Sequence, residues 1–484
     1  MSHVTRVRRE IQRYLAIEPV QVAELDLEPG PERGPERGPG PESDGGGVLR
    51  PGPGSPPVTH GEVFLLVRRG GRPVAALLGR VPEGADPRAV LTELARRHPD
   101  SGPAPAPAPA AAGSALPFTT VVIATRERAD RLAHALDSML AQDHPDFEIV
   151  VVDNAPVTDT TRDLVGRKYA ERVRYVTEPV PGLAVAHNTG LAAARGDVVA
   201  FTDDDVVADP RWLTQLTAPF AADPGLGCAT GLILPARLRT PAQVLLESHG
   251  GFAKGFTPRT YDPVDPPADE PLFPFTAGRF GSGANMAFRT GVLRAVGGFD
   301  PATGAGTLAR GGDDLYGFVR VLAQGHRLHY TPQALVWHHH RETWQDLETQ
   351  AYGYGAGLTA YLTALLVNRP ALLPAFLALL PRGLAHGRAL TAARNTDARG
   401  AEGVPGAPGT SGAPGTPGVP FVPGVPGGHD DRGHPWPRRL SRLQRKGMVY
   451  GPVGYLRARR ALRAVPTSEV TGGAEVTGAA GRSR

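Results

Sequence analysis

Short apolar segments alternate with segments of helical spacing in the central part of the chain. Residues 119–124 and 148–152 are apolar and rich in Thr, Val and Ile, which is typical of buried strands. Between them, residues 130–142 carry leucines four positions apart, which predicts an amphipathic helix. This strand, helix, strand order predicts an α/β fold with a mostly parallel, Rossmann-like sheet and helices on both faces.

The first 100 residues predict a small α+β accessory module. Residues 63–67 and 74–78 are apolar and flank a Gly-Gly turn, which predicts a hairpin followed by a short helix. An insert near residues 29–57 repeats Gly, Pro, Glu and Arg, a composition that cannot bury enough apolar surface to become ordered. Alternating Pro and Ala within residues 101–116 predict a stiff linker, so a new domain begins near residue 117.

The chain after the domain 117–345 divides into three parts. Residues 346–398 are apolar and helical, but no run of about 20 apolar residues is uninterrupted, so interfacial or core helices are favoured over a spanning helix. Residues 399–435 repeat Gly-x-Pro and predict a flexible tether. Residues 436–484 form a basic tail, which either lies on anionic lipid or is a solvated helix.

Composition and charge indicate how much of the chain can fold, and which compartment and partners suit it. The 484 residues include 61 Gly and 50 Pro, so the folded part is shorter than the chain. The single cysteine, Cys228, excludes an internal disulfide framework and fits a reducing cytoplasm. The net charge of +4 is modest, and no nucleic acid partner is expected, but residues 432–463 hold ten Arg or Lys and no acid. We expect a cytoplasmic protein that lies peripherally at the inner face of the plasma membrane.

Three successive carboxylates, residues 203–205, follow the apolar residues 198–201 directly. Like charges repel by roughly 1 kcal/mol per close pair, so such a cluster is most natural where a divalent cation neutralises it. The alternative is a solvated acidic turn. Polar groups also follow the first two strands, at residues 125–128 and 153–154. Because ligands bind at the carboxyl ends of parallel strands, the sequence predicts a nucleotide pocket at this edge.

Six short blocks follow one another in the same part of the chain. In order they are Thr120-Val-Val-Ile-Ala-Thr-Arg, Val150-Val-Val-Asp-Asn, Phe201-Thr-Asp-Asp-Asp, Gly281-Ser-Gly-Ala-Asn, Gly297-Gly-Phe-Asp and Gly311-Gly-Asp-Asp-Leu. Together they resemble the family 2 glycosyltransferases of GT-A fold, over about residues 117–345. The resemblance implies an inverting, metal-dependent transfer of a sugar from a nucleotide-diphosphate donor to a hydroxyl of a glycan or lipid-linked acceptor, in cell-surface polysaccharide, glycolipid or secondary glycan synthesis.

The resemblance also implies which residues hold the nucleotide. Thr125 and Arg128 after the first strand, with Asp153 after the second, are expected to bind the base and ribose. Asn188 lies in a segment that is near the nucleotide in the family. Asp153 has an alternative role in an Asx-type turn, and Asn188 has one at a helix end.

The resemblance places a metal at the acidic triplet. Its first and third members match the family's DxD motif, and alternate strand residues share one face, so we expect Asp205 to bind the metal and Asp203 to contact the ribose or a water-mediated shell. Some family members supply a late histidine to this metal, and His338 resembles it, although a solvent-facing histidine cluster is the alternative. Oxygen ligands predict Mg²⁺ or Mn²⁺, and a nitrogen ligand favours Mn²⁺.

The family's acidic pair ahead of a helix is matched by Asp313 and Asp314. The resemblance implies that Asp314 is the catalytic base and that Asp313 orients it or binds the acceptor. Adjacent carboxylates raise the pKa of one of them, which suits a proton acceptor, whereas simple stabilisation of the helix N-terminus is the alternative. Gly283 and Asn285 lie in a segment of small residues, where we expect the backbone to line the donor sugar and the acceptor.

Two other functions compete with this one. A nucleotidyltransferase would require a Gly-rich triphosphate loop with a lysine after the first strand, where this chain has Thr125-Arg-Glu-Arg. A noncatalytic, membrane-tethered nucleotide-sugar-binding or scaffold protein would explain the accessory module, the tether and the basic tail. The intact carboxylates argue against the scaffold.

Overall fold

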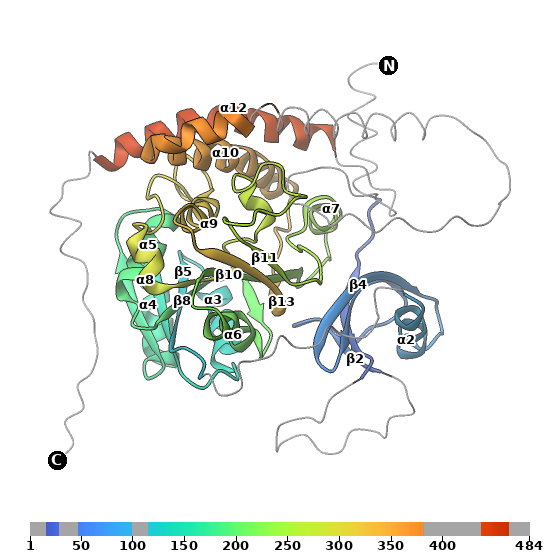
Figure 1. Cartoon of the computed structure of the whole chain (residues 1–484). Coiled ribbons are helices and arrows are strands. Elements are labelled where there is room, and N and C mark those ends of the chain that lie inside the picture. The colour runs from blue at the N-terminus through green and yellow to red at the C-terminus, as the bar shows by residue number, and fades with distance from the viewer. Residues whose placement is uncertain (1–15, 29–46, 99–114, 380, 382–436, 464–484) are drawn as a thin grey trace, which may run out of the picture.

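The computed structural model describes residues 16–28, 47–98, 115–379, 381 and 437–463 (Figure 1). The described residues contain a four-stranded sheet in the order β2-β1-β3-β4. They also contain a nine-stranded sheet in the order β11-β13-β10-β12-β8-β5-β6-β7, with β9 paired to β13. The large sheet carries the candidate site, and the small sheet lies beside it at the lower right of Figure 1.

The large sheet is mixed: six of its nine strands run in one direction, as predicted, and β9, β11 and β12 run antiparallel to their neighbours. Its strands are β5 (Thr119–Thr125), β6 (Phe147–Asn154), β7 (Val173–Glu178), β8 (Val198–Asp203), β9 (Val206–Ala208), β10 (Leu226–Pro235), β11 (Arg259–Tyr261), β12 (Asn285–Arg289) and β13 (Arg327–His338). Strand β5 runs parallel to β6 and β8, and β10 runs parallel to β13. Strand β12 lies antiparallel between β8 and β10. Every residue of β10 is buried, as expected when both faces are covered.

Helices cover both faces of this sheet. They are α3 (Ala129–Leu140), α4 (Thr160–Leu164), η2 (Val165–Tyr169), α5 (Leu183–Ala193), α6 (Trp212–Ala222), α7 (Pro241–Gly250), η3 (Ala277–Arg279), α8 (Thr290–Ala295) and α9 (Asp313–Ala323). Successive residues of β5 enter different cores: Val121 lies in the core that contains Leu132 of α3. Val122 lies in the opposite core with Phe318 of α9. This alternation confirms the predicted α/β layers.

The N-terminal module contains β1 (Gln21–Asp26), β2 (Val48–Pro51), β3 (Gly61–Arg69), β4 (Arg72–Val81) and α2 (Pro87–Arg97). The predicted hairpin is β3 with β4. Residues 48–51 fall in the insert that was expected to be unordered, but they pair antiparallel with β1 and so gain backbone hydrogen bonds. Residues 29–46 lie outside the described part of the chain.

The module packs against the large domain. Arg68 of β3 donates to Asp209 over 2.7 Å and to Glu24 over 2.9 Å. Phe64 of β3 shares a buried cluster with Trp337 of β13. The N-terminal module thus packs against β13, the strand that ends at the candidate site.

Two C-terminal helices lie side by side across the top of the domain in Figure 1: α10 (Trp344–Asn368), which is followed by η4 (Pro370–Leu372), and α12 (Arg438–Arg463). Glycines allow the close approach, because a Cβ on Gly355 would lie 1.9 Å from the backbone oxygen of Gln444, and one on Gly447 would lie 2.1 Å from that of Tyr352. The predicted basic tail is therefore partly a packed helix. The predicted tether, residues 399–435, and residues 464–484 lie outside the described part.

None of the described helices alone is long and apolar enough to cross a bilayer. Trp344–Asn368 and Pro370–Leu379 reach that length and composition only as a pair, and the pair is bent by 110°.

Candidate active site

The carboxyl ends of three neighbouring strands meet at one edge of the large sheet. In the register of the sheet, Thr125 pairs with Asp153, and Ala124 pairs with Asp203. The structure therefore brings together the polar residues that were predicted from the ends of β5, β6 and β8. This is the edge at which α/β sheets bind ligands.

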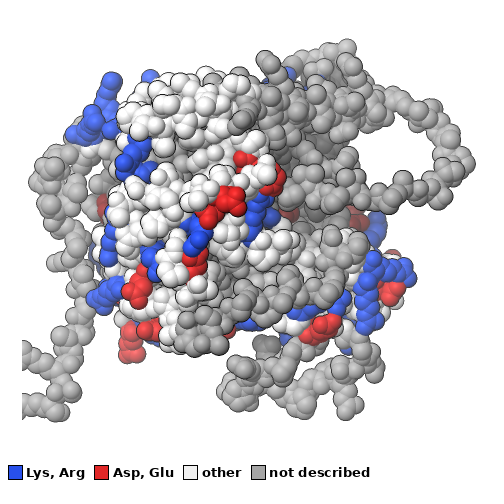
Figure 2. Space-filling view, in the orientation of Figure 1, with Lys and Arg blue, Asp and Glu red and all other residues white. Residues whose placement is uncertain are grey.

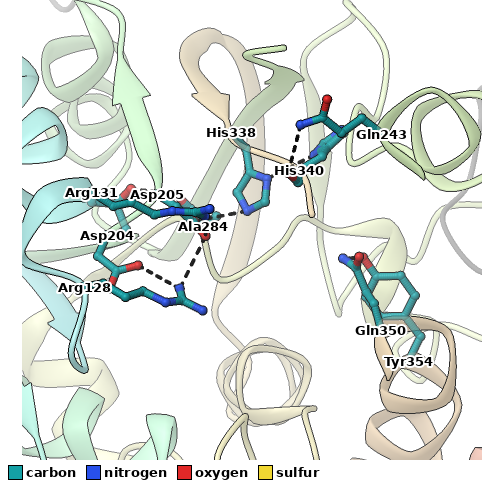
Figure 3. A network of polar contacts seen from close by, with 11 residues as sticks. Arg128, Arg131, Asp204, Asp205, Gln243, Ala284, His338, His340, Gln350 and Tyr354 are labelled. Carbon is teal, nitrogen blue, oxygen red and sulfur yellow. Dashed lines mark hydrogen bonds and ion pairs between the residues drawn. The ribbon is translucent and has the colours of Figure 1, made fainter. Parts of the chain in front are cut away.

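Asp204, the middle carboxylate of the triplet, anchors two of the predicted nucleotide-binding residues. It accepts a hydrogen bond from the Thr125 hydroxyl over 2.7 Å. It accepts another from Arg128 over 3.1 Å (Figure 3). Arg128 and Arg131 also lie 3.5 Å and 3.7 Å from an oxygen of Asp205. The sequence analysis assigned no role to Asp204. The one indication was that successive strand residues point to opposite faces, which directs the Asp204 side chain away from those of Asp203 and Asp205.

The other two carboxylates form a potential metal site. Asp203, Asp205 and His338, called here the metal cluster, each offer a ligand atom, and these atoms lie within 4.8 Å of one another. Strand β9 pairs with β13 so that Val206 opposes His338, which brings the end of β13 beside the triplet. His338 Nε2 lies 3.4 Å from Asp205 Oδ1.

A chain of hydrogen bonds behind His338 sets which of its nitrogens faces the metal cluster (Figure 3). His340 Nε2 lies 2.9 Å from Glu247, and His340 Nδ1 lies 3.1 Å from His338 Nδ1. A carboxylate accepts, so this contact selects the tautomer of His340 that donates through Nε2 and accepts at Nδ1. His338 then donates through Nδ1 and turns the lone pair of Nε2 towards Asp205. Two acceptors facing each other at 3.4 Å fit a cation between them.

The protonation states in the metal cluster also suit a cation. Burial lowers the pKa of His338 to about 4, so the ring is neutral at neutral pH. Burial opposes ionisation of Asp205, but the positive charge that His338 carries in acid and the guanidinium groups of Arg341 and Arg128 outweigh it and lower the pKa of this carboxyl. Burial and the adjacent carboxylates raise the pKa of Asp203 well above its ordinary value. A cation would relieve this crowding of negative charge.

Asp153 has one oxygen free for a ligand. Its side chain is fully buried, and one oxygen accepts a hydrogen bond of 2.7 Å from the Tyr175 hydroxyl. Among the described residues, the other oxygen, Oδ1, has no hydrogen-bond partner. Burial raises the pKa of Asp153. An orphaned buried oxygen fits a donor such as a ribose hydroxyl or a base N–H.

The two asparagines assigned to ligands have other partners. Asn285 is completely buried, accepts from Trp212 Nε1 over 2.8 Å and donates to the backbone oxygens of Leu232 and Ala334. The amide is therefore saturated inside the fold, and Asn285 is not among the residues that line the cavity described below. Asn188 exchanges two hydrogen bonds with the backbone of Phe299, so its amide ties α5 to the loop after α8 instead of facing the nucleotide edge.

The acid pair, Asp313 and Asp314, begins α9 after Gly312, whose φ of 90° favours glycine. Asp314 Oδ2 accepts a hydrogen bond of 2.9 Å from the Gly283 backbone, as expected if Gly283 lies beside the reacting groups. Asp313 lies 3.2 Å from Nδ1 of the buried His187. Burial and Asp313 raise the pKa of Asp314 to about 6.

Asp203 of the metal cluster and both members of the acid pair face one cavity. This cavity of about 580 Å³ is lined by Asp203, Gly283, Asp313 and Asp314. Lys254 lines it too, and sequence reasoning missed this residue. Burial lowers the pKa of Lys254 to about 7, against the opposing effect of Asp314. Lysine is rare in this chain, with three among 52 Lys and Arg, but no sequence motif singles out Lys254.

Comparison with known sequences agrees with this geometry. Residues 120–295 match the model of Glycosyl transferase family 2. Together with the curated relatives described below, the match confirms a family 2 glycosyltransferase domain over residues 120–295. It covers the strands that carry Thr125, Asp153 and the acidic triplet and ends before the acid pair.

Two curated relatives and one solved structure illustrate the similarity. The chain is 29% identical over 242 residues to the Pre-mycofactocin glycosyltransferase of Mycobacterium tuberculosis (strain ATCC 25618 / H37Rv), covering 49% of this chain and 46% of the relative. It is 38% identical over 130 residues to the Validoxylamine A glucosyltransferase of Streptomyces hygroscopicus subsp. jinggangensis, covering 25% and 30%. Mannosyltransferase PcManGT from Pyrobaculum calidifontis, solved with GDP-Man and Mn²⁺, is 24% identical with a TM-score of 0.40 and covers 59% and 80%. The chain thus spans less than half the length of these two curated relatives.

Proposed function

We propose that this chain is an inverting, metal-dependent glycosyltransferase that moves a sugar from a nucleotide-diphosphate donor to an acceptor hydroxyl. The observation that carries the proposal is that Asp203 of the metal cluster and both members of the acid pair line one cavity. A donor sugar in that cavity would lie between the two acidic groups. Direct displacement requires this arrangement, because the leaving group and the attacking hydroxyl occupy opposite sides of the anomeric carbon.

The donor half consists of the strand ends and the metal cluster. Asp153 offers its unpaired oxygen to the nucleoside, while Thr125 and Arg128 are held in place by Asp204. The donor set of two carboxylates and one imidazole fits Mn²⁺ or Mg²⁺, and the nitrogen favours Mn²⁺. The bound cation would stabilise the negative charge on the departing diphosphate.

The acceptor half depends on Asp314. In the proposed reaction, Asp314 takes the proton of the acceptor hydroxyl while that oxygen bonds to the anomeric carbon and the nucleoside diphosphate leaves with the electron pair of the broken bond. The configuration inverts, and no covalent enzyme intermediate forms. With a pKa of about 6, Asp314 is ionised at neutral pH but is a better base than an exposed aspartate.

The biological setting is proposed to be the inner membrane surface, with a glycan or lipid-linked acceptor in cell-surface polysaccharide, glycolipid or secondary glycan synthesis. Helix α12 supports this, because it exposes the apolar Val449, Val453 and Leu456 beside exposed cations. Lys and Arg gather at its C-terminal end, at the upper left of Figure 2. Replacing Arg457 and Arg460 by Gln should weaken salt-sensitive sedimentation with anionic vesicles, and unchanged sedimentation would contradict membrane binding by α12.

The competing proposal is a noncatalytic nucleotide-sugar-binding or scaffold protein, favoured by the packed N-terminal module and the paired helices α10 and α12. A panel of nucleotide sugars tests both proposals by following Mn²⁺-dependent release of nucleoside diphosphate. The enzyme should release it from one donor, and Asp314→Asn should lower the rate about 100-fold or more while nucleotide affinity changes little. Metal-dependent binding without turnover of any donor would favour the scaffold.

A further inference from the structure

The cavity continues past the acid pair into an apolar half. Its lining there comes from the loop before η3, from α9 and α10, and from the segment after η4: Leu272, Phe275, Leu315, Leu358, Leu362 and Phe376. None of the strand-end residues Thr125, Arg128 and Asp153 lines this cavity. The apolar half is therefore separate from the strand ends proposed to hold the nucleotide, and we place it on the acceptor side of Asp314.

Two cations line the same cavity without a carboxylate partner. Among the described residues, no ion pair within 4.0 Å joins Lys254 or Arg310 to an acid. Arg310 lies over the Tyr352 ring at 5.4 Å and is exposed, whereas Arg279 is paired with the buried Glu270 over 2.9 Å. Lys254 is therefore the inner cation, and an ammonium in an apolar cavity is stabilised when an anion meets it.

We propose that the acceptor is an amphipathic anion. It would place an apolar chain or ring in the apolar half, a phosphate or carboxylate against Lys254, and the reacting hydroxyl at Asp314. A plain glycan fits this half poorly, because sugar hydroxyls packed on leucine and phenylalanine side chains would lose hydrogen bonds to water without replacement. The inference rests on the proposed function, because it assigns the substrate class of the same site.

The anion has two possible sources, a lipid phosphate and a soluble carboxylate or phosphate with an apolar group. Gln444 and Met448 of α12 also line the cavity. The same helix exposes Arg445 and Lys446 close by in sequence. The cavity is thus next to the surface proposed to lie on anionic lipid, but a soluble ligand would use the same contacts.

Calorimetry on the full chain tests the substrate class. The probes are octyl phosphate, octanol and inorganic phosphate, each titrated in the presence of Mn²⁺ and a nucleoside diphosphate. Octyl phosphate should bind at least about tenfold more tightly than either of the other two. Lys254→Met should remove most of this preference and leave octanol binding unchanged, whereas Lys168→Met, a matched change at an exposed lysine, should change nothing. Equal affinities for the three probes, or an affinity for octyl phosphate that is unchanged in Lys254→Met, would overturn the inference.

A second arm separates the sources. Phosphatidylcholine vesicles with and without a prenyl phosphate are compared with soluble 4-phenylbutyrate as competitors for octyl phosphate. Competition by either one, lost in Lys254→Met, supports the inference and identifies the source, and competition by neither overturns it. Nucleoside diphosphate binding, measured in the same samples, distinguishes failure of this inference from failure of the proposed function. If the nucleotide binds and octyl phosphate shows no preference, only this inference fails; if Mn²⁺-dependent nucleotide binding is absent, the proposed function fails.

Discussion

The backbone N–H of Gly283 donates a hydrogen bond of 2.9 Å to Oδ2 of Asp314. This contact ties the loop before β12 to the first turn of α9, two elements 31 residues apart. It also fixes one oxygen of the carboxylate. The other oxygen, Oδ1, accepts from the backbone of Leu315 over 2.8 Å. The orientation of the proposed base is therefore set by the backbone and does not depend on the substrate.

The raised pKa of Asp314 predicts the acid limb of the pH profile. The proposed base must be ionised, so kcat/KM should fall about tenfold per pH unit below about pH 6. Steady-state rates of nucleoside diphosphate release between about pH 5 and pH 8 would measure this. A rate that stays constant down to about pH 5 would contradict the assignment of Asp314 as base.

The same pKa predicts that the ionised carboxylate of Asp314 lowers the free energy of unfolding. A carboxyl whose pKa rises on folding, here from 3.8 to about 6, is disfavoured as the ion in the native state. The cost is complete above about pH 6, shrinks as the pH falls and vanishes below about pH 4. Asp314→Asn removes this cost, up to about 3 kcal/mol at neutral pH, but its amide can accept from only one of the two backbone N–H groups. The free energy of unfolding of the variant relative to the unsubstituted protein should therefore be higher at neutral pH than at about pH 5. Urea denaturation at the two pH values would show this, and a difference independent of pH would contradict it.

The different partners of Asp204 and Asp205 predict different metal phenotypes. Asp205→Ala removes a member of the metal cluster and should weaken Mn²⁺ and nucleoside diphosphate binding together, by about tenfold or more. Asp204→Asn is the neighbouring control, because Asp204 binds Thr125 and Arg128, and it should leave Mn²⁺ affinity nearly unchanged. Calorimetry measures both. Equal losses in the two variants would show that the triplet does not divide its roles in this way.

Glu247 should affect the metal without touching it. Glu247→Gln weakens the acceptor that fixes the His340 tautomer and, through it, the direction of the His338 lone pair. We expect about a tenfold loss of Mn²⁺ affinity, measured by electron paramagnetic resonance of the free ion. Glu348→Gln is a matched control, because Glu348 pairs with Arg439 of α12 and has no contact with the metal cluster. Unchanged affinity in Glu247→Gln would contradict the relay.

Much of the donor side could be predicted from the sequence. In the sequence, the strand ends are apolar runs that stop at polar residues. Parallel strands place their carboxyl ends at the same edge of a sheet. Thr125, Asp153 and Asp203 were therefore expected at that edge, where the structure has them. The proximity of His338 to Asp205 came from the family resemblance, and the structure brings it about through the short strand β9.

The remaining features depend on contacts between distant segments. Asn285 has a position typical of a ligand contact, yet its partners Trp212, Leu232 and Ala334 lie 49 to 73 residues away and close around it. Lys254 belongs to no motif, and only the folded cavity brings it near Asp314. Similarly, residues 48–51 look unordered by composition but are held by pairing with β1.

The central claim is that the metal cluster holds a cation and the donor diphosphate on one side of a sugar-sized cavity, with Asp314 on the other. A crystal structure with Mn²⁺ and a nucleoside diphosphate, with data collected at the manganese absorption edge, tests it most directly. The account predicts one anomalous peak at about 2.0–2.3 Å from a carboxylate oxygen of Asp205 and from Nε2 of His338, with diphosphate oxygens completing the shell. A manganese ion bound away from these two residues, or a nucleotide lying in the apolar half against Leu358 and Leu362, would contradict it.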